Sequence, residues 1–145
     1  FSKSPGVPNS FGLIGTEANA IAPGKKPLSS MTPTIVLRDG KPLLAVGASG
    51  GPRIITGTLQ AILNVVDFGM DVEAAVSSPR FHHQWVPETL YIERELPLDV
   101  RAALMAKGHK LEIGDSENVV QAVMFRDGQF TGASDPRKGG RPAGY

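Results

Sequence analysis

Two adjacent glycines, Gly50 and Gly51, separate an apolar run ending at Ser49 from an apolar segment that begins after Pro52. The first run predicts a strand and the second a helix. Main-chain N–H groups at a helix start are free, lie at the positive end of the helix dipole, and can be approached closely where side chains are absent. Such a junction could bind an anion or stabilise charge developing on a carbonyl oxygen. On geometry alone a plain strand-to-helix turn is favoured, and a phosphate loop is excluded because its Lys-Ser/Thr ending is absent.

A pair of hydroxyls, Ser29 and Ser30, lies between Pro27 and Pro33, just ahead of a β-rich run. Hydroxyl groups can hold a carboxylate in place without adding charge. A serine nucleophile needs an adjacent base, and no neighbouring residue supplies one. A plain serine turn is therefore the competing interpretation, and the motif by itself favours it.

His82 and His83 stand side by side in the motif RFHHQW. Adjacent histidines in an extended segment point in different directions, and no carboxylate-rich segment completes a ligand set, so we predict no metal site. A structural role is favoured, with Trp85 anchoring the core. The motif ASDPRKGG, which contains Asp135, is predicted to form a surface turn with a solvated cluster of charges.

Turn signals and periodicity predict the elements that position these residues. Asp-Gly pairs at 39–40 and 127–128 each lie between β-rich runs and predict two hairpins. The first hairpin is almost continuously apolar, which predicts strands covered on both faces. The expected elements are, in order, a hairpin (33–49), a helix ending at Gly69, a short helix (72–78), a strand (90–95), a helix (96–107), a strand (110–114) and a hairpin (119–134).

The helix that follows Pro52 has apolar residues at helical spacing, so it should be amphipathic or more fully buried. Its main apolar face is predicted from Ile55, Leu59, Ile62, Leu63 and Val66, and it is widened by Ile54, Ala61 and Val65 until most of the helix is expected to be buried. The helix over 96–107 should bury a face made of Leu96, Val100 and Leu104.

The length of 145 residues suits one domain with a continuous core. A net charge of +1 argues against nucleic acid or an anionic surface as the main partner, and no apolar stretch approaches the length of a membrane span. The absence of cysteine excludes disulfides and thiolate chemistry. Residues 1–26 are predicted to be a long loop, and because Phe1 reads as the middle of that loop we expect truncation or processing before it.

Five motifs occur in one order along nearly the whole chain: PGVPNSFGLIG, NAIAPGKKPLSSMTPTIV, GASGGPRIITGTLQAILN, PRFHHQW and GASDPR. Together they resemble the C-terminal part of the small subunit of bacterial-type γ-glutamyltranspeptidase. The resemblance implies an N-terminal-nucleophile (Ntn) hydrolase, in which an autoprocessed precursor exposes a threonine that attacks γ-glutamyl amides such as glutathione. It also implies an α+β fold, here the C-terminal segment of a four-layer αββα sandwich, with residues 1–145 as a single domain fragment.

The resemblance assigns roles to the residues that carry it. Gly50 and Gly51 match the glycines whose N–H groups form the family's oxyanion hole. Ser29 and Ser30 match the pair that binds the α-carboxylate of the γ-glutamyl group, helped in the family by an arginine of the large subunit.

Residues 1–26 would comprise a lid loop and the approach to the serine pair. The lid itself, from Pro5 to Gly15, would cover the glutamyl pocket. Phe11 stands where well-known bacterial members carry a tyrosine. Because phenylalanine cannot make the phenolic hydrogen bond, we expect a looser lid and greater access for water.

The resemblance implies no cofactor. The threonine nucleophile is absent from this chain, so the implied partners are the large subunit and the N-terminal part of the small subunit in a heterodimer, and the chain alone is expected to be inactive. Bacterial members are exported, which implies a periplasmic or secreted location. Two alternatives stay open: a cephalosporin-type acylase on the same scaffold, and a non-catalytic domain that binds a γ-glutamyl ligand.

Overall fold

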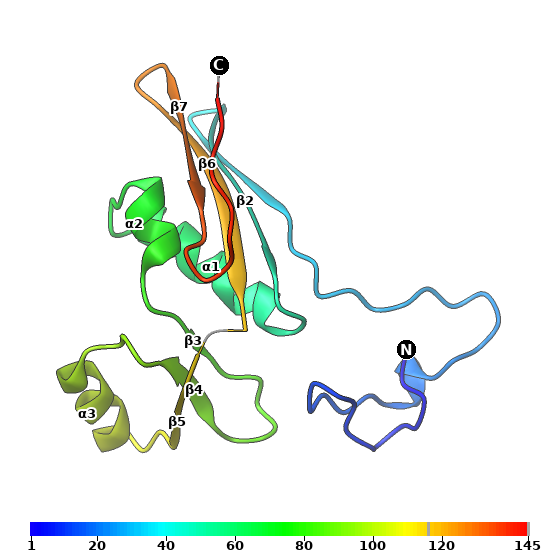
Figure 1. The fold of residues 1–145 in the computed structure, drawn as a ribbon. Coiled ribbons are helices and arrows are strands. Elements are labelled where there is room, and N and C mark those ends of the chain that lie inside the picture. The colour runs from blue at the N-terminus through cyan, green and yellow to red at the C-terminus, as the bar shows by residue number, and fades with distance from the viewer. Residues whose placement is uncertain (116, 145) are drawn as a thin grey trace.

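The structure, a computed structural model, describes residues 1–115 and 117–144. The elements shown in Figure 1 follow closely the order expected from the sequence; the short β3 and η1 are additions that turn and periodicity signals did not predict. The elements are η1 (Glu17–Asn19), β1 (Thr34–Arg38), β2 (Lys41–Ser49), α1 (Arg53–Val66), α2 (Val72–Ser77), β3 (Phe81–His82), β4 (Leu90–Glu93), α3 (Leu98–Ala106), β5 (Leu111–Gly114), β6 (Val119–Arg126) and β7 (Gln129–Ser134).

The main sheet has the order β1-β2-β6-β7 and is antiparallel throughout. Each predicted hairpin is present, and its Asp-Gly turn has positive φ at both residues: 52° and 75° at Asp39 and Gly40, 53° and 79° at Asp127 and Gly128. Turns of this kind match the twist of the strands that they connect, which explains why the two Asp-Gly pairs were reliable signals. The hairpins join where β2 pairs with β6.

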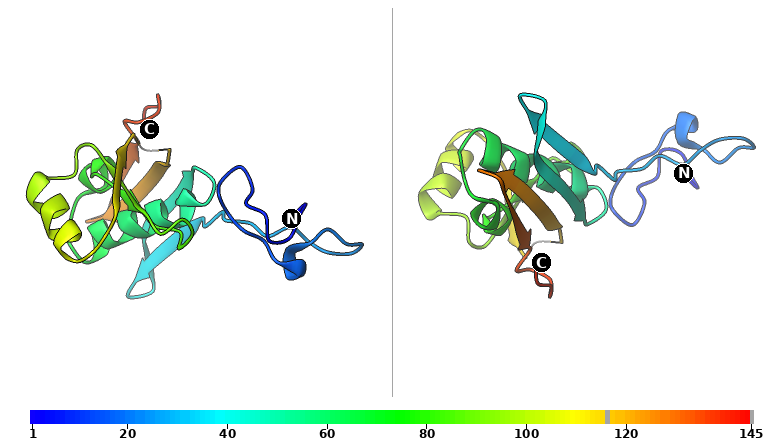
Figure 2. Two further views of the ribbon diagram at one scale, coloured as in Figure 1. Left: turned by 90° about the horizontal axis from the view of Figure 1, so that it is seen from below. Right: turned by 90° about the horizontal axis from the view of Figure 1, so that it is seen from above.

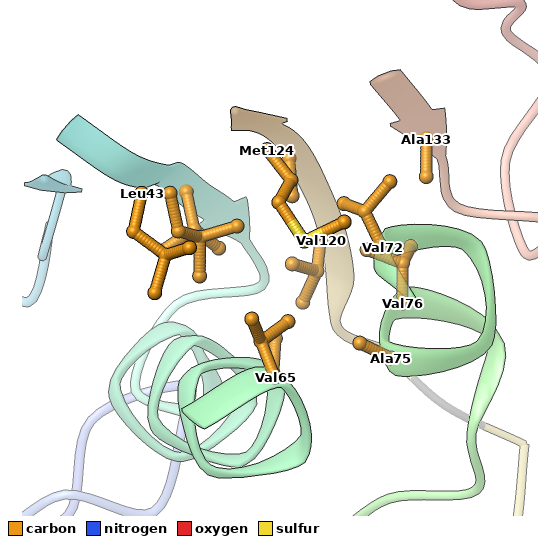
Figure 3. Close-up of a cluster of buried hydrophobic side chains, with 12 residues drawn as sticks. Leu43, Val65, Val72, Ala75, Val76, Val120, Met124 and Ala133 are labelled. Atoms are coloured by element: carbon orange, nitrogen blue, oxygen red, sulfur yellow. The ribbon is translucent and has the colours of Figure 1, made fainter. Parts of the chain in front are cut away.

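Helices α1 and α2 cover one face of this sheet (Figures 1 and 3). The cross-strand row Val46, Ala122 and Ala133 is buried there, and Val65 of α1 and Val76 of α2 pack in the same cluster. Burial of such side chains stabilises the fold by roughly 1.5–3 kcal/mol for each large aliphatic group. The core therefore fixes α1, and with it the glycine junction that precedes the helix.

The buried face of α1 is not the one that was predicted. Its buried residues are Ile54, Gly57, Thr58, Ala61 and Val65. Leu59 and Leu63, on the predicted main face, are exposed, so the expectation of a mostly buried helix is wrong for the described residues. The sheet can cover only one side of a helix, and no described element covers the opposite side.

The second face of the main sheet is open as well. The row Ile35, Ala45, Val123 and Gly132 is exposed, although the apolar runs predicted cover on both faces. A groove of about 590 Å³ lies along this face and is lined partly by residues 141–143 near the C-terminus. The pattern of residues is that of a strand buried on both sides, but within the described residues most of the second layer is absent.

A smaller sheet, β3-β4-β5, lies below the main one in Figure 1. Strands β4 and β5 are parallel and are connected through α3. Helix α3 has no buried residue, and of its predicted apolar face Leu96 and Leu104 are half-buried while Val100 is exposed. Within the described ranges, none of the helices combines the length and apolar character that a bilayer crossing needs.

The N-terminal residues form an arm that projects from the body of the molecule (Figures 1 and 2). The arm is held mainly by its own bonds: Ser2 bridges to Ala20, and Lys25 Nζ donates to three main-chain carbonyls of residues 17–20. Residues 27–33 then run without helix or strand to β1. Residues 1–26 are therefore a loop that carries only the short η1, as the composition predicted.

Candidate active site

The backbone conformation and the close neighbours at positions 50 and 51 both require glycine. Gly50 has φ +133° and Gly51 has φ +55°, conformations that residues with side chains rarely adopt. A Cβ on Gly50 would lie 2.5 Å from the carbonyl oxygen of Glu117, and one on Gly51 would lie 2.9 Å from Cε1 of Phe11. Strain and crowding thus act together, and the close neighbours are a main-chain carbonyl and an aromatic ring.

The pair also begins helix α1. The carbonyls of Gly50 and Gly51 accept hydrogen bonds from the N–H groups of Arg53 (3.1 Å) and Ile54 (3.2 Å). Among the described residues, the N–H groups of the two glycines themselves donate no hydrogen bond. Two main-chain donors at the positive end of a helix are suited to a carbonyl oxygen that gains negative charge.

Of the two serines, only Ser30 is bonded to this junction. Its Oγ donates to the carbonyl oxygen of Gly51 at 3.1 Å, across 21 residues of sequence. The Oγ of Ser29 accepts from the N–H of Met31 at 3.2 Å, and Ser29 is exposed. The structure thus brings Ser30 to Gly51, and Ser29 is adjacent in the chain with its hydroxyl bonded within its own turn.

The loop from Pro5 to Gly15 folds back on itself. At its base the N–H of Gly6 donates to the carbonyl of Gly15 at 2.8 Å, beside the half-buried Pro5. Near its tip Asn9 Oδ1 accepts from the N–H groups of Phe11 (2.9 Å) and Leu13 (3.0 Å). These bonds hold the tip, where the ring of Phe11 lies against Gly51.

The histidine segment contacts the same loop. Gln84 Nε2 donates to the carbonyl of Phe11 at 3.0 Å, and Gln84 Oε1 lies 3.0 Å from His82 Nε2. The other ring nitrogen of His82 lies 2.9 Å from Thr56 Oγ1 on α1. Burial lowers the pKa of His82, and the nearby charge of Arg53 acts in the same direction, although the Gln84 bond opposes it. His82 is therefore a buried, hydrogen-bonded group whose neutral form is favoured by burial.

The expectation that Trp85 anchors the core is wrong. Its side chain is 80% exposed, because the chain leaves β3 after His82 and carries Trp85 beyond the small sheet. His82, not Trp85, is the buried member of this motif. Within the described residues, no group of three or more His, Cys, Asp or Glu side chains is arranged to hold a metal ion.

The motif ASDPRKGG is not a solvated turn. Asp135 is 1% exposed and lies in a buried ion cluster with Arg80, Glu93 and Arg137. Asp135 is bonded to Arg80 Nη2 at 2.5 Å and to Arg137 Nη1 at 3.0 Å. Arg137 Nε donates to Glu93 Oε1 at 2.8 Å, and the main-chain N–H of Arg80 donates to Glu93 Oε2 at 3.1 Å. The two guanidinium groups and the two carboxylates of this cluster thus contact one another inside the fold.

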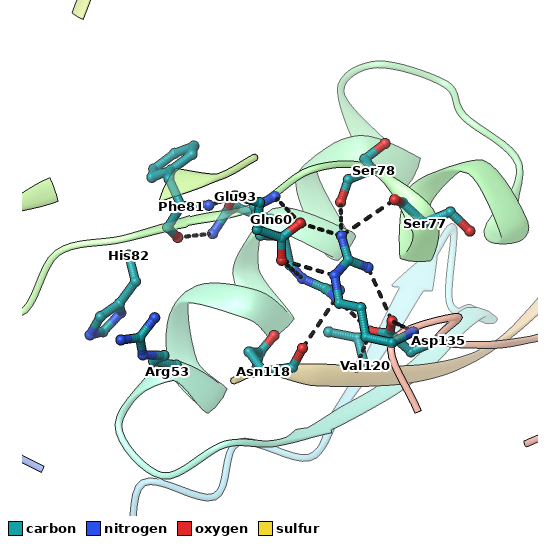
Figure 4. Close-up of polar contacts among 12 residues, drawn as sticks. Arg53, Gln60, Ser77, Ser78, Phe81, His82, Glu93, Asn118, Val120 and Asp135 are labelled. Atoms are coloured by element: carbon teal, nitrogen blue, oxygen red, sulfur yellow. Dashed lines mark hydrogen bonds and ion pairs between the residues drawn. The ribbon is translucent and has the colours of Figure 1, made fainter. Parts of the chain in front are cut away.

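Partners outweigh the effect of burial at Asp135 and Arg137 but not at Arg80. Burial alone raises the pKa of Asp135, but hydrogen bonds from the N–H groups of Val120 and Arg137 and from both guanidinium groups outweigh it and hold that pKa below its usual range. Burial lowers the pKa of Arg137, and bonds to Glu93 and Asp135 more than reverse the effect. Burial also lowers the pKa of Arg80, as does the charge of Arg137. Figure 4 shows several of these contacts.

A cavity of about 340 Å³ lies beside α1 and the small sheet, and several of its lining side chains are charged. Arg53 lines it, with its guanidinium 4.7 Å from the centre of the Tyr91 ring and an ion pair to Glu117 at 3.4 Å. Neither glycine of the junction and neither serine contributes to its lining. The residues that the sequence assigned to chemistry therefore lie outside this cavity.

The profile of the family described as Gamma-glutamyltranspeptidase matches residues 1–145. The chain is 49% identical over 138 residues to the glutathione hydrolase proenzyme of Escherichia coli (strain K12) and 45% identical over 157 residues to that of Pseudomonas sp. (strain A14). These matches cover 94% and 100% of the chain but only 24% and 27% of the relatives, so the chain spans about a quarter of their length.

Solved structures agree with the sequence matches. A γ-glutamyltranspeptidase of Helicobacter pylori has a TM-score of 0.90 at 48% identity, covering 95% of this chain and 77% of that one. The enzyme of Pseudomonas nitroreducens, complexed with L-DON, has a TM-score of 0.86 at 44% identity, covering 100% and 76%. A cephalosporin acylase from Bacillus halodurans is less similar, with a TM-score of 0.74 at 25% identity, covering 81% and 23%. The α+β class and the Ntn-hydrolase scaffold expected from the sequence are confirmed, and the chain belongs to the γ-glutamyltranspeptidase family.

Proposed function

We propose that this chain is the C-terminal part of the small subunit of an enzyme that cleaves γ-glutamyl amides such as glutathione. The enzyme would transfer the glutamyl group to water or to the amine of an amino acid or peptide. The observation that carries the proposal is the meeting of three separate motifs at Gly51: its carbonyl accepts from Ser30 Oγ and its Cα faces the ring of Phe11.

The geometry supports a division of roles. The N–H groups of Gly50 and Gly51 would donate to the γ-carbonyl oxygen when the threonine of another segment attacks the carbonyl carbon. One such donor lowers the barrier by roughly 3–4 kcal/mol. The hydroxyls of Ser29 and Ser30 would bind the α-carboxylate. Ser29 would donate its O–H to the ligand while its oxygen keeps accepting from the N–H of Met31, and Ser30 would turn its O–H from the carbonyl of Gly51 to the ligand. Departure of the amine would leave an acyl-enzyme, which water or an acceptor amine resolves.

Other segments of the same precursor would complete the site. The open row Ile35, Ala45 and Val123 offers an apolar surface on a sheet whose other face is covered, and in the four-layer αββα sandwich that the resemblance implies a second sheet would pack on this face. The N-terminal part of the small subunit and the large subunit are therefore the proposed partners. Without them the chain lacks the nucleophile, so we expect it to be inactive alone.

The proposal is tested in the complete precursor. Hydrolysis of γ-glutamyl-p-nitroanilide should be measured for the wild type, Gly51→Ala and the control Gly139→Ala. The added methyl at Gly51 meets both positive φ and the ring of Phe11, whereas Gly139 has open space and no positive φ. We expect Gly51→Ala to lower kcat by roughly 10²–10³-fold, the loss typical of an oxyanion donor, and Gly139→Ala to retain activity.

The same assay separates the alternatives. A cephalosporin-type acylase would prefer an acyl group without an α-amino group, such as a glutaryl amide, over the γ-glutamyl substrate. A non-catalytic domain would bind glutamate in a calorimeter but release no p-nitroaniline. Either result in the wild-type protein would refute the proposed activity.

A further inference from the structure

We propose that Asn118 is a positioning residue for the Gly50–Gly51 junction, held in place by the buried ion cluster; the inference rests on the proposed function. Asn118 is buried immediately before β6 and is drawn in Figure 4 beside the cluster. No motif in the sequence singled it out.

Asn118 holds the strand end that leads into the glycines. Its Nδ2 donates to the carbonyl oxygen of Ser49 at 3.1 Å, and Ser49 is the last residue of β2. The main chain of the same segment also touches the junction: a Cβ on Gly50 would lie 2.9 Å from the Cα of Asn118 and 2.5 Å from the carbonyl oxygen of Glu117. The residue therefore contacts the junction through its side chain and through its backbone.

Helix α1 is shaped to admit this side chain. A Cβ on Gly57 would lie only 1.8 Å from Oδ1 of Asn118, so no other residue type fits at that position with the amide in place. Glycine is unfavourable inside a helix, and its presence in the second turn of α1 needs a local reason. The approach of Asn118 supplies that reason. One amide thus sits between the end of β2 and the start of α1, the two elements that flank the glycine pair.

The ion cluster fixes the backbone that carries Asn118. Arg80 Nη2 donates to the carbonyl of Asn118 at 3.3 Å and is also bonded to Asp135. The N–H of Val120 donates to Asp135 Oδ2 at 2.7 Å. The main chain is anchored on both sides of Val119 by groups that are themselves buried and paired. An oxyanion donor must be held to within a fraction of an ångström, and this chain of contacts is suited to hold it.

The test uses Asn118→Asp in the complete, processed enzyme, with Asn64→Asp as the matched control. The first change keeps the size of the side chain but replaces the donor to Ser49 with an oxygen. Asn64 Nδ2 donates to the carbonyl of Ala75 at 3.1 Å, so the control removes a bond of the same kind and length between α1 and α2. kcat and KM are measured with γ-glutamyl-p-nitroanilide, and Kd is measured for glutamate and for its boronic acid analogue, which forms a tetrahedral anion.

If Asn118→Asp displaces the junction, the enzyme should bind the transition state less tightly and the substrate as before. We expect Asn118→Asp to lower kcat by about tenfold to a hundredfold and to weaken the boronic acid by a similar factor, with KM and the Kd of glutamate within about twofold. Asn64→Asp should change none of these values by more than about twofold. If Asn118→Asp retains the kcat of the control, or if KM rises while kcat holds, the inference is overturned although the proposed function stands. A wild type without γ-glutamyl hydrolysis refutes the function itself.

A second pair of variants decides the question where the Asn118→Asp precursor fails to mature. Gly57→Ala alone should reduce both thermal stability and kcat, because the new methyl displaces the amide. The double variant Gly57→Ala/Asn118→Ala has no such clash, but it also lacks the hydrogen bond to Ser49. Recovered stability with a kcat that stays low supports positioning, and recovery of both shows that Asn118 serves packing alone.

Discussion

Replacing Asp135 with asparagine should destabilise the protein far more than its place in a Pro- and Gly-rich turn motif indicates. The carboxylate is bonded to Arg80 and Arg137 and accepts the N–H groups of Val120 and Arg137. Asparagine has nearly the same shape but no charge, and its amide nitrogen cannot accept. Two buried guanidinium groups would then share the single carboxylate of Glu93.

The size of the effect follows from this imbalance. Removing one partner of a buried ion pair typically costs about 3–5 kcal/mol, because the remaining charge stays buried without compensation. The N–H of Val120 loses an acceptor in addition, which costs roughly 1–3 kcal/mol when no other acceptor replaces it. These contributions overlap, so we expect the free energy of unfolding to fall by about 3–5 kcal/mol.

The assay is a urea titration of the assembled enzyme followed by circular dichroism, at pH 7 and pH 5. The pKa of Asp135 is held below its usual range, so its contribution is complete above the unfolded-state value of about 3.9 and is lost as the pH falls through the lowered pKa. The difference between wild type and Asp135→Asn should therefore be the same at both pH values. It should shrink only in stronger acid.

The control is Asp115→Asn. Asp115 and Arg94 form an ion pair of 3.2 Å whose side chains are 89% and 64% exposed, and such pairs contribute about 1 kcal/mol or less. If Asp135→Asn lowers the stability no more than Asp115→Asn does, the cluster does not stabilise the fold and the reasoning fails. A gap that already closes between pH 7 and pH 5 would contradict the lowered pKa.

Three further outcomes are expected. Phe11→Tyr in the complete enzyme should raise the ratio of transfer to hydrolysis, because a phenolic hydrogen bond can hold the lid loop closed. An unchanged ratio would refute the expectation of a loose lid. Val123→Asp, on the open sheet face, should prevent association of the subunits in size-exclusion chromatography, whereas Leu98→Asp on the exposed α3 should not; equal behaviour would mean that the open face is not an interface. Because burial lowers the pKa of His82, the midpoint of its ring NMR titration should lie below the ordinary value of about 6.5, and a midpoint at or above that value would contradict the lowered pKa.

The parts of the fold that the sequence predicted are those governed by local rules. Both hairpins follow from Asp-Gly turns, whose φ values are set by two residues each. Helix α1 follows from its spacing and from Gly50 and Gly51 ahead of it. Ser30 and Phe11 were found through motifs shared with a family, and nothing in the spacing alone predicted their contact with Gly51. That contact depends on how the arm folds back, which is a tertiary property.

The ion cluster was missed because its members are distant in sequence and look solvated one by one. Arg80 and Asp135 are 55 residues apart. A weak signal did exist: alternation along β7 places Asp135 on the same side as Ala133, which is buried. Exposed faces were misjudged for the opposite reason. Ile35 and Leu59 have the composition of buried positions, and composition does not say which chain segment provides the cover.

The position of the ion cluster also gives a reason why charged side chains, and not apolar ones, occupy this part of the interior. It lies where the end of α2, β4, the start of β6 and the segment after β7 meet, and apolar contacts there would lack the directionality of hydrogen bonds to charged groups. A guanidinium with fixed donor directions permits few arrangements. Since Arg80 Nη2 bonds both Asp135 and the carbonyl of Asn118, the group that fixes this meeting point also fixes the segment that abuts Gly50. Stability and the geometry of the glycine junction are then set by the same bonds, and a substitution in the cluster should alter both together.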